Sequence, residues 1–435
     1  MASAHSPVIG PARRGGARPK LAFFDSCDVF EDFYPHYGVD QPTFAHTWAG
    51  TGNHAFIRLL QHEVGDVTWY ELTLRPGLRE ANHEVAGCRV RFVRSSWLHR
   101  QLWKAFYLPK SAWRWRGLYP WYALCASYLA PLSADLLRAL RHDRPDLVIM
   151  QDYASGKFDV LLAIAACLDI PLVARHSGSR PDGYIGKNVR RWTIRRADLM
   201  IASGAAERAL LVERFGVPTE RVIVVLTPID TTAFRPIPRR EACAAVGLDA
   251  GRRYLLFVGR LSDHEKRVSS LIEAFATIAD RYRDTDLLVV GEGRDGARLR
   301  ALAQARAPGR VRFLGWASGP DRLAPLYSAA TCLVLPSNRE GFPAVVGEAM
   351  SCGTPVLASR VGGVPELVTD GRTGWLIRPG DDGALVERLE HVLAHAAETE
   401  GMRWEARRSA ERRVSPVVVG MQLRECLQRV LARRG

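Results

Sequence analysis

The sequence predicts an α/β protein with two doubly wound domains, each a parallel sheet that carries helices on both faces. Short apolar runs of strand length alternate with helix-length segments along the chain of 435 residues. The runs are continuously apolar, which is typical of parallel strands that are buried on both faces. They form two series, and the segment 227–239, which contains three prolines, separates them. Two such series predict two domains joined by that segment.

The first series predicts strands at Leu21–Phe24, Val67–Leu72, Val90–Val93, Leu147–Met150, Leu172–Ala174, Leu199–Ala202 and Val222–Leu226. The second series predicts strands at Tyr254–Val258, Leu287–Val290, Val311–Leu314, Cys332–Leu335, Pro355–Ala358 and Gly374–Ile377. Beyond residue 415, apolar side chains recur at helical spacing and predict a terminal helix. We therefore expect a basic tail at 1–19, a first domain at 20–228, a second domain at 229–414 and a final helical segment at 415–435.

The composition favours a globular cytosolic protein with an anionic partner. None of the eight cysteines forms a Cys-x-x-Cys pair, so we expect reduced thiols. The first 20 residues lack the apolar segment of a secretory signal, and no run of about 18 apolar residues predicts a membrane span. The net charge of +14 points to nucleic acid, acidic lipid headgroups or phosphorylated substrates, and an arginine-rich composition alone gives the same excess.

The stretch from Glu340 to Glu348, with the sequence EGFPAVVGE, carries the clearest functional signal. It follows an apolar strand, Gly341 and Pro343 predict a turn, and a helix is expected from near Ala344. The first turn of a helix presents free backbone N–H groups and the positive end of its dipole, which bind anions. The two carboxylates would repel a phosphate, but they suit hydrogen bonds from sugar hydroxyls. The stretch therefore predicts a pocket for a phosphorylated sugar, and nucleotide-sugars are the obvious ligands.

Two more strand ends of the second series carry candidate ligand groups. Arg260 and Lys266 follow the first strand of that series, where two cations can neutralise a leaving nucleoside diphosphate. A solvated arginine and lysine on a loop are the alternative. Gly291 and Gly293 follow the next strand, and this Gly-Glu-Gly turn either lets a phosphate or nucleoside approach the backbone or is only a tight turn.

Two further loops of the second series have more than one interpretation. The loop that begins at Gly315 either walls a slot for a nucleobase or only packs. The double glycine Gly362–Gly363 permits positive φ and close backbone approach. For Glu366, which follows it, we favour the role of a helix-start carboxylate over that of a ligand.

In the first series, His176 stands at a strand end that faces the same crevice. A loop with Gly50 and Gly52 precedes the helical run Ala55–Glu63, so its backbone N–H groups are candidates for contact with the diphosphate. The segment Tyr34–Gly38 is a rival for that role, and the sequence leaves both open.

The segment from Trp97 to Trp121 contains five of the eleven tryptophans, interleaved with Lys104, Lys110, Arg114 and Arg116. Such a stretch can lie on an anionic membrane surface, with tryptophan at the headgroup level. It can also stack on bases or sugars, or it can be an ordinary helix with a buried tryptophan face. We keep an anionic membrane surface as a candidate partner of residues 97–121.

These pieces, in this order, resemble a retaining GT-B glycosyltransferase of glycosyltransferase family 4. The resemblance is dense between about residues 145 and 380 and fades before residue 145. It rests on Pro145–Ile149, Gly259–Leu261, Lys266, Leu271–Phe275, Gly291–Gly293, Pro336–Ser337, Glu340, Glu348–Met350, Gly353–Val356, Gly362–Gly363 and Thr373–Gly374.

The resemblance implies two Rossmann-like domains around a central crevice, with the acceptor on the first domain and the nucleotide-sugar on the second. It also implies that the last helix returns to the first domain. Arg260 and Lys266 would hold the diphosphate, Glu340 would contact the sugar, Glu348 the ribose, and His176 would lie beside the transferred sugar. The other positions that we expect to bind the donor are Gly50, Gly52, Gly259, Gly291, Gly293, Gly315, Gly341, Phe342, Pro343, Ala344 and Val345.

The expected activity is transfer of a sugar from a nucleotide-sugar to a hydroxyl acceptor with retention of anomeric configuration. No metal is expected, because two cations and a helix start take its place. A UDP-sugar is the default donor, with GDP- and ADP-sugars open, and the acceptor is a lipid-linked or small glycan or metabolite. No nucleic-acid partner is expected, and the expected location is the cytoplasm, with the inner face of the membrane as an alternative. The rival hypotheses are a nucleotide-sugar epimerase on the same scaffold and a non-catalytic protein that binds anions or membranes.

The sequence departs from the family pattern at three places. The usual double glycine soon after the first strand is missing. Residues 227–230 read Thr-Pro-Ile-Asp where Asn-Gly-Val-Asp is common, and Arg267 follows Lys266 where glycine is common. None of these departures removes a charged group that the expected mechanism needs.

Overall fold

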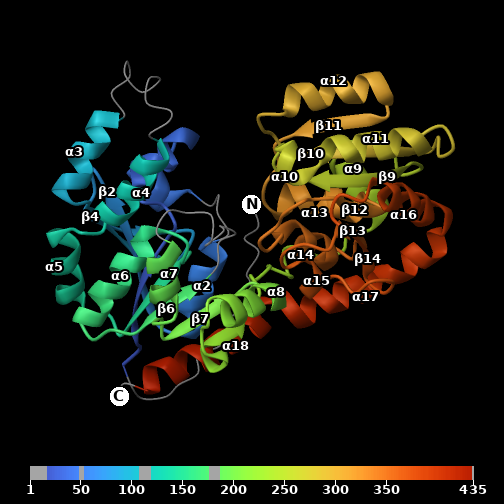
Figure 1. Ribbon diagram of the computed structural model, residues 1–435. Coiled ribbons are helices and arrows are strands. Elements are labelled where there is room, and N and C mark those ends of the chain that lie inside the picture. The colour runs from blue at the N-terminus through green and yellow to red at the C-terminus, as the bar shows by residue number, and fades with distance from the viewer. Residues whose placement is uncertain (1–16, 49–52, 107–118, 176–186, 434–435) are drawn as a thin grey trace, which may run out of the picture.

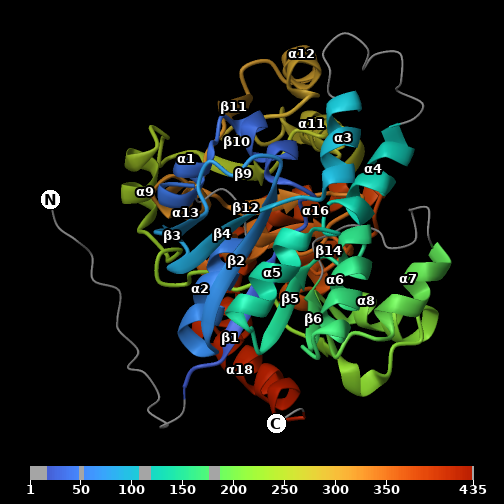
Figure 2. The same cartoon turned by 90° about the vertical axis from the view of Figure 1, so that its left-hand side faces the viewer.

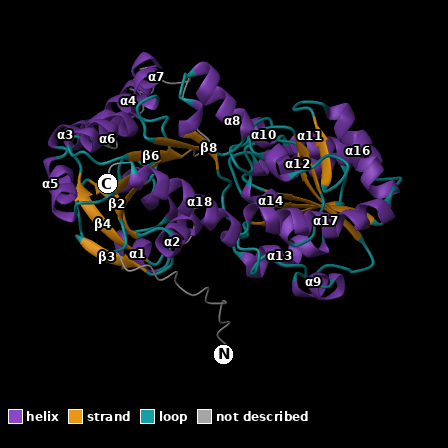
Figure 3. Ribbon diagram, turned by 90° about the horizontal axis from the view of Figure 1, so that it is seen from below, coloured by secondary structure: helices purple, strands orange, loops and turns teal. Residues whose placement is uncertain are grey.

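Two α/β domains stand side by side in the computed structural model, which describes residues 17–48, 53–106, 119–175 and 187–433 (Figure 1). The first domain occupies the left of Figure 1 and the second the right, and segments at the bottom of the view connect them. Each domain is built on one sheet, and Figure 3 shows helices on both faces of these sheets. The predicted fold class of two doubly wound domains is confirmed.

The first sheet has the strand order β3-β4-β2-β1-β5-β6-β7-β8 within the described residues. Every neighbouring pair is parallel except β3 with β4, which is antiparallel. The strands are β1 (Lys20–Phe24), β2 (Asp66–Thr73), β3 (Glu80–His83), β4 (Cys88–Arg94), β5 (Leu147–Gln151), β6 (Leu172–Arg175), β7 (Leu199–Ala202) and β8 (Val222–Val224).

The helices of the first domain follow its strands and cover the sheet, and Figure 2 shows them from the side of this domain. They are η1 (Phe30–Asp32), η2 (Tyr34–Tyr37), α1 (Gln41–His46), α2 (Asn53–Glu63), α3 (Trp97–Phe106), α4 (Tyr119–Leu129), α5 (Ala134–Asp143), α6 (Gly156–Cys167), α7 (Lys187–Ile194), α8 (Ala205–Ala209), η4 (Leu210–Arg214) and η5 (Thr219–Arg221). Local chemistry sets some of their boundaries. The Ser133 hydroxyl, for example, accepts hydrogen bonds from the first free amides of α5.

The second sheet has the order β11-β10-β9-β12-β13-β14, and all of its described pairs are parallel. Its strands are β9 (Arg253–Val258), β10 (Thr285–Val290), β11 (Val311–Gly315), β12 (Cys332–Leu335), β13 (Val356–Ser359) and β14 (Gly374–Ile377). Its helices are α9 (Arg239–Ala245), α10 (Asp263–Lys266), α11 (Val268–Ile278), α12 (Gly296–Arg306), α13 (Pro320–Ala329), α14 (Ala344–Ser351), α15 (Val364–Leu367) and α16 (Asp382–Ala394).

The chain ends in two long helices, α17 (Ala396–Val414) and α18 (Pro416–Ala432), which run from the second domain to the first (Figure 1). Helix α18 packs against α2, and its apolar side chains join the core of the first domain. Arg424 of α18 forms an ion pair with Glu63 of α2. The domains are therefore connected by the segment between β8 and α9 and by this helical return.

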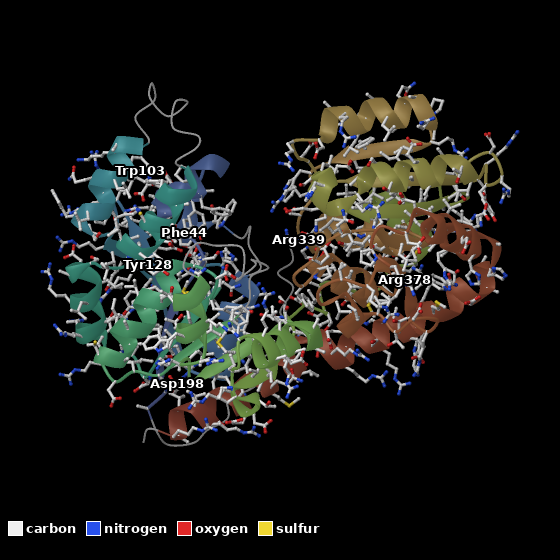
Figure 4. All side chains as sticks on the ribbon, viewed as in Figure 1. Phe44, Trp103, Tyr128, Asp198, Arg339 and Arg378 are labelled. Atoms are coloured by element: carbon white, nitrogen blue, oxygen red, sulfur yellow. The ribbon has the colours of Figure 1, made fainter. Side chains whose placement is uncertain are left out.

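The carboxyl ends of the strands in the first domain point to the upper end in Figure 4. Asp198, immediately before β7, is labelled at the lower end of this domain, and Trp103 of α3 is labelled near the upper end. Arg339, which follows β12, lies on the side of the second domain that faces the first (Figure 4). The loop that follows β12 therefore faces the first domain at the carboxyl end of its strand, which is where ligands bind in doubly wound sheets.

The sequence missed β3. Glu80 and Asn82 of this strand are exposed and His83 is buried, because the strand lies at the edge of the sheet beyond β4. An edge strand lacks the continuously apolar signal that marks the buried ones. The predicted parallel sheet therefore carries one antiparallel edge strand that the sequence did not predict.

One stretch of the described residues, Tyr122–Asp143, is long and apolar enough for a membrane span by length and composition only. It is divided between α4 and α5, with Pro131 and Ser133 between the two helices. Leu136 and Leu140 of this stretch belong to the buried core of the first domain. The stretch is therefore accounted for by the packing of the fold.

Candidate active site

The candidate site lies where the second sheet changes the direction of its connections. In the order β11-β10-β9-β12-β13-β14, strand β9 lies next to β12, and the chain winds away from this pair on both sides. The crevice outside the carboxyl ends of two such strands is the usual ligand position in a doubly wound sheet. Arg260 and Lys266 follow β9, and the stretch from Glu340 follows β12, so the sheet brings both predicted groups to one place.

The side chains of Lys266 and Glu340 are in direct contact. Lys266 Nζ lies 2.7 Å from Glu340 Oε1 and 2.8 Å from Oε2. Only 7% of the Glu340 side chain and 19% of the Lys266 side chain are exposed. The resemblance implies that Lys266 binds the diphosphate and that Glu340 binds the sugar. A donor that contacts both side chains must therefore place its sugar–phosphate bond next to this ion pair.

The loop after β12 holds the lysine in position. The backbone N–H of Asn338 donates to the Glu265 carbonyl at 2.8 Å, and its side-chain amide donates to the His264 carbonyl at 3.0 Å. Both acceptors belong to α10, which ends at Lys266. The cation and the carboxylate are thus fixed by main-chain contacts between their own two loops.

Arg267 explains one departure from the family pattern. It ends α10 with φ of 52°, in the left-handed region that glycine adopts without strain. Its guanidinium donates to Asp382 Oδ1 at 2.7 Å and to Ser270 Oγ at 3.0 Å. These bonds offset the strain of a non-glycine residue, and they direct the arginine away from the Lys266–Glu340 pair.

Arg260 is exposed, and among the described residues no acid or hydrogen-bond acceptor contacts its guanidinium. Its backbone position is well fixed, because Leu261 N donates to the Glu292 carbonyl at 2.9 Å and Ser262 N donates to the Arg260 carbonyl at 2.9 Å. Of the two predicted cations, Lys266 already has an anionic partner in Glu340. Arg260 is therefore the one that is free to bind an incoming anion.

The turn Gly341–Pro343 leads into α14, which begins at Ala344 as expected. Val346 N donates to the Pro343 carbonyl at 3.0 Å, which leaves the amides of Ala344 and Val345 without a partner within the helix, at the positive end of the dipole. The double glycine supports the turn, since Gly363 N donates to the Gly341 carbonyl at 2.7 Å. A Cβ at Gly362 would stand 2.2 Å from the Glu340 carbonyl oxygen, so only glycine allows this close packing.

Glu348 lies one turn into α14 and is partly buried. The Tyr327 hydroxyl donates to Glu348 Oε2 at 2.8 Å. Burial raises the pKa of Glu348 above its usual value, and the tyrosine hydrogen bond opposes this shift. One carboxylate oxygen is thus held by protein, and the other is available to accept a hydrogen bond from a ligand hydroxyl. No pattern in the sequence pointed to Tyr327.

The predicted glycine positions lie in closely packed loops beside the site. Gly291 N donates to the Gly315 carbonyl at 2.8 Å, and Gly259 N donates to the Val290 carbonyl at 3.0 Å. A Cβ at Gly291 would stand 1.9 Å from the Gly259 carbonyl oxygen, and one at Gly293 would stand 2.5 Å from that of Leu261. The loops that follow β9, β10 and β11 therefore interlock by their backbones.

We expect Gly291→Ala to destabilise the second domain by about 3 kcal/mol or more, because its Cβ meets backbone and its φ is +134°. Gly309→Ala is the matched control, since it also has positive φ but its Cβ meets nothing within 4 Å. That control should cost only about 1 kcal/mol. Denaturant unfolding of both variants measures the difference, and equal losses would contradict the interlocked loops.

The site borders the junction of the two domains. Glu366 of α15 accepts a hydrogen bond at 2.6 Å from the backbone N–H of Ala205, the first residue of α8 in the first domain. Glu366 is a helix-start carboxylate, as the sequence favoured, but the helix that it caps belongs to the other domain. A Cβ at Gly363 would stand 3.1 Å from the Ser203 carbonyl oxygen, after β7. The loops after β7 and β13 thus meet beside Glu340.

The candidates of the first domain are only partly described. His176, Gly50 and Gly52 lie outside the described residues. The rival segment Tyr34–Gly38 forms the turn η2, and its amides are used locally, because Gly38 N donates to the Pro35 carbonyl. Tyr34 points into the core, where its hydroxyl donates to Asp25 Oδ2 at 3.0 Å.

Tyr34 belongs to a buried acidic cluster at the ends of β1 and β2. Lys157 Nζ donates to the Cys27 carbonyl at 2.6 Å and lies 3.5 Å from Asp25 Oδ1. Glu71 of β2 is fully buried, and burial, with Asp25 nearby, raises its pKa well above the usual range. Burial raises the pKa of Asp28 to about 7, although the Lys157 charge opposes this shift. These groups interact with one another in the core of the first domain, so we expect them to serve its structure and not to bind the donor.

Asp28 makes a pH-dependent contribution to stability. Its folded pKa of about 7 is higher than its usual value of 3.8, so the folded protein binds more protons than the unfolded chain between these values. Its stabilising contribution is therefore complete below pH 4 and is lost as the pH rises through 7. We expect Asp28→Asn to raise Tm at pH 8 by on the order of 5 °C and to leave it nearly unchanged at pH 4. Asp280→Asn, at an exposed site, is the control, and an equal gain at both pH values would contradict the shift.

Comparison with known proteins identifies the family. Residues 252–395 match the family model described as "Glycosyl transferases group 1", and residues 67–233 match that of "Glycosyltransferase Family 4". Curated relatives include D-inositol 3-phosphate glycosyltransferases of Nocardiopsis dassonvillei, 33% identical over 62% of this chain and 68% of that protein, and of Frankia alni, 32% identical over 61% and 71%.

Solved structures share the fold. The complex of Anabaena HepE with UDP-glucose has a TM-score of 0.69 at 20% identity, covering 95% of this chain and 100% of that chain. Sucrose-phosphate synthase of Thermosynechococcus elongatus has a TM-score of 0.70 at 23% identity, covering 96% and 100%. The two doubly wound sheets, the motif order and these matches agree: the chain belongs to glycosyltransferase family 4 and is a glycosyltransferase with the GT-B fold.

Proposed function

We propose that this enzyme transfers a sugar from a UDP-sugar to a hydroxyl group of an acceptor, with retention of anomeric configuration and without a metal ion. The observation that carries the proposal is the Lys266–Glu340 contact at the carboxyl ends of β9 and β12, with the exposed Arg260 on the same loop after β9 as Lys266. Anabaena HepE, a structural neighbour, is known in complex with UDP and with UDP-glucose, which supports UDP over other nucleotides.

The positions of the charges suit the departure of a nucleoside diphosphate. Negative charge grows on the diphosphate as its bond to the sugar breaks, and fixed cations stabilise that charge most when it is fully developed. Arg260 offers a planar pair of donors, and Lys266 offers a point charge. The first amides of α14 add hydrogen-bond donors, and together these groups supply the positive charge that a metal ion would otherwise provide.

The carboxylates suit the neutral parts of the donor. In this proposal Glu340 accepts hydrogen bonds from hydroxyls of the transferred sugar, and Glu348 accepts them from the ribose. The acceptor attacks the face that the diphosphate leaves, and the departing phosphate takes the proton of the attacking hydroxyl. Retention follows from this same-face geometry. His176 and the backbone of the loop at Gly50 and Gly52 complete the proposed set from the first domain.

The acceptor is a hydroxyl compound, either lipid-linked or small. The curated relatives are named for inositol 3-phosphate, a phosphorylated polyol, and this supports an acceptor with a phosphate near its hydroxyl groups. We place the reaction in the cytoplasm, in agreement with eight cysteines that are all free. Association with the inner face of the membrane is argued in the next subsection.

A thermal-shift panel of UDP-, GDP- and ADP-sugars tests the donor. A ligand that binds only the folded state stabilises it by about 2.7 kcal/mol at a hundred times its Kd. We expect UDP-sugars to raise Tm and the other two classes to raise it less. A donor that changes configuration without any acceptor would favour an epimerase, and the absence of any shift would favour a non-catalytic protein.

A further inference from the structure

A basic groove lies at the upper end of the first domain, away from the Lys266–Glu340 pair. It has a volume of about 680 Å³ and lies between the residues that follow β2, the end of β4 and one side of α3. Figures 1 and 2 both show α3 at this end of the domain, opposite α18. Its lining includes Arg75, Arg94, Arg100 and Lys104.

These four cations have no acidic partner among the described residues. Among the described residues that line the groove, Glu31 is the one carboxylate, and its two oxygens accept hydrogen bonds from Thr73 Oγ1 at 2.6 Å and from Leu74 N at 3.0 Å. Arg91, earlier on the same strand β4 as Arg94, shows the contrast, since it is paired with both Asp143 and Glu80. The groove therefore holds an excess of positive charge that the fold itself does not neutralise.

Three large apolar side chains surround the start of α3 and are exposed to solvent. Trp97 is 63% exposed, Leu98 56% and Leu132 57%. Leu132 is held beside the other two, because Ser96 N donates to the Ala130 carbonyl at 3.2 Å and Ser133 Oγ donates to the Arg94 carbonyl at 2.5 Å. Trp97 also lines the groove beside Arg94 and Arg100, so the apolar side chains at the start of α3 adjoin the cations.

The rest of α3 anchors this surface firmly to the domain. Trp103 Nε1 donates to Asp32 Oδ1 at 2.9 Å, and His99 is fully buried. The helix therefore presents a fixed face with apolar side chains at one end and cations along the groove. A helix with such a face lies in the interface of an anionic bilayer, with its apolar residues below the headgroups and its cations on their phosphates.

We propose that Arg75, Arg94, Trp97, Leu98, Arg100, Lys104 and Leu132, here called the α3 surface, dock the enzyme on a membrane that contains anionic phospholipids. The groove receives the phosphate of a lipid headgroup, and the three apolar side chains enter the bilayer interface. The strand ends of the first domain then lie near the membrane, so the acceptor hydroxyl is carried by a lipid. The identity of the acceptor rests on the proposed function, whereas the docking does not.

Vesicle flotation with the full chain tests the docking. We compare vesicles of phosphatidylcholine alone with vesicles that contain phosphatidylglycerol as well, at low and high salt. Wild type should float only with the anionic vesicles and should be released by salt. Arg94→Gln/Arg100→Gln/Lys104→Gln should weaken binding on the order of a hundredfold, since each cation near an anionic surface contributes about fivefold. Trp97→Ala/Leu98→Ala should also weaken it.

The matched control is Arg235→Gln/Arg240→Gln/Arg322→Gln, which removes the same charge from exposed, unpaired arginines of the second domain. It should bind vesicles as wild type does. Equal flotation with both vesicle types, or equal losses in the two triple variants, would overturn the proposal. The proposal would also be overturned if the groove bound only soluble glycerol phosphate and not vesicles. In that case glycerol phosphate would raise the Tm of wild type but not that of the groove variant, and neither protein would float with anionic vesicles. A UDP-dependent rise in Tm that persists in the groove variant shows that it is folded and that any failure concerns docking, not donor binding.

Discussion

Lys266→Met should lower kcat by a factor on the order of 10² to 10³, the usual cost of removing one fixed group that stabilises charge in a transition state. The methionine keeps the length of the side chain but removes the charge that opposes the diphosphate. The same change leaves Glu340, whose side chain is only 7% exposed, without its counter-ion. The variant should therefore also be less stable, since an unpaired buried carboxylate is costly. Steady-state kinetics and thermal unfolding measure the two effects separately.

The double variant Lys266→Met/Glu340→Gln separates catalysis from stability. Removal of both charges should restore most of the lost Tm, because no unpaired carboxylate remains. It should not restore kcat, because the diphosphate still lacks its cation and the sugar lacks its acceptor oxygens. Turnover within tenfold of wild type in Lys266→Met, or recovery of kcat in the double variant, would contradict the assigned roles.

Glu348→Ala should weaken donor binding by about 10- to 100-fold, because a hydrogen bond to a charged group contributes about 1.5–3 kcal/mol. The effect should fall on the Kd of the nucleotide more than on kcat, since the ribose lies away from the bond that breaks. Calorimetric titration with UDP measures it. A variant that binds UDP as tightly as wild type would remove Glu348 from the donor site.

Tyr327→Phe is the control for this prediction. It removes the hydroxyl that donates to Glu348 Oε2 and leaves the carboxylate in place. We expect only a small loss of UDP affinity, about threefold, as for a carboxylate that loses one positioning hydrogen bond. A loss as large as that of Glu348→Ala would mean that the carboxylate acts through the tyrosine and does not contact the donor.

The sheets and the two motif loops could be predicted because they depend on local sequence. A continuously apolar run is enough to predict a buried strand such as β9 or β12, and the turn residues after it predict the loop. Residues whose role depends on distant partners could not be found in this way. The contact between Lys266 and Glu340 joins loops 74 residues apart and requires β9 and β12 to be neighbours. The typical strand order of a doubly wound sheet would have predicted that β9 and β12 are adjacent.

Other misses have the same cause. Tyr327 is an ordinary core residue in the sequence, and only the packing of α13 against α14 brings it to Glu348. Glu366 was correctly interpreted as a helix-start carboxylate, but no local pattern shows that its helix belongs to the other domain. The edge strand β3 was missed because exposed strands need no apolar pattern.

The anomeric configuration of the first product tests the central claim most directly. Slow hydrolysis of an α-linked UDP-sugar by the enzyme, followed by NMR in the presence of a metal chelator, reports which anomer is released before mutarotation. Retention at a site that relies on Arg260 and Lys266 predicts that the α-anomer appears first, that the chelator leaves the rate unchanged, and that Lys266→Met abolishes the signal. Initial release of the β-anomer, or turnover that requires an added divalent ion, would contradict the account.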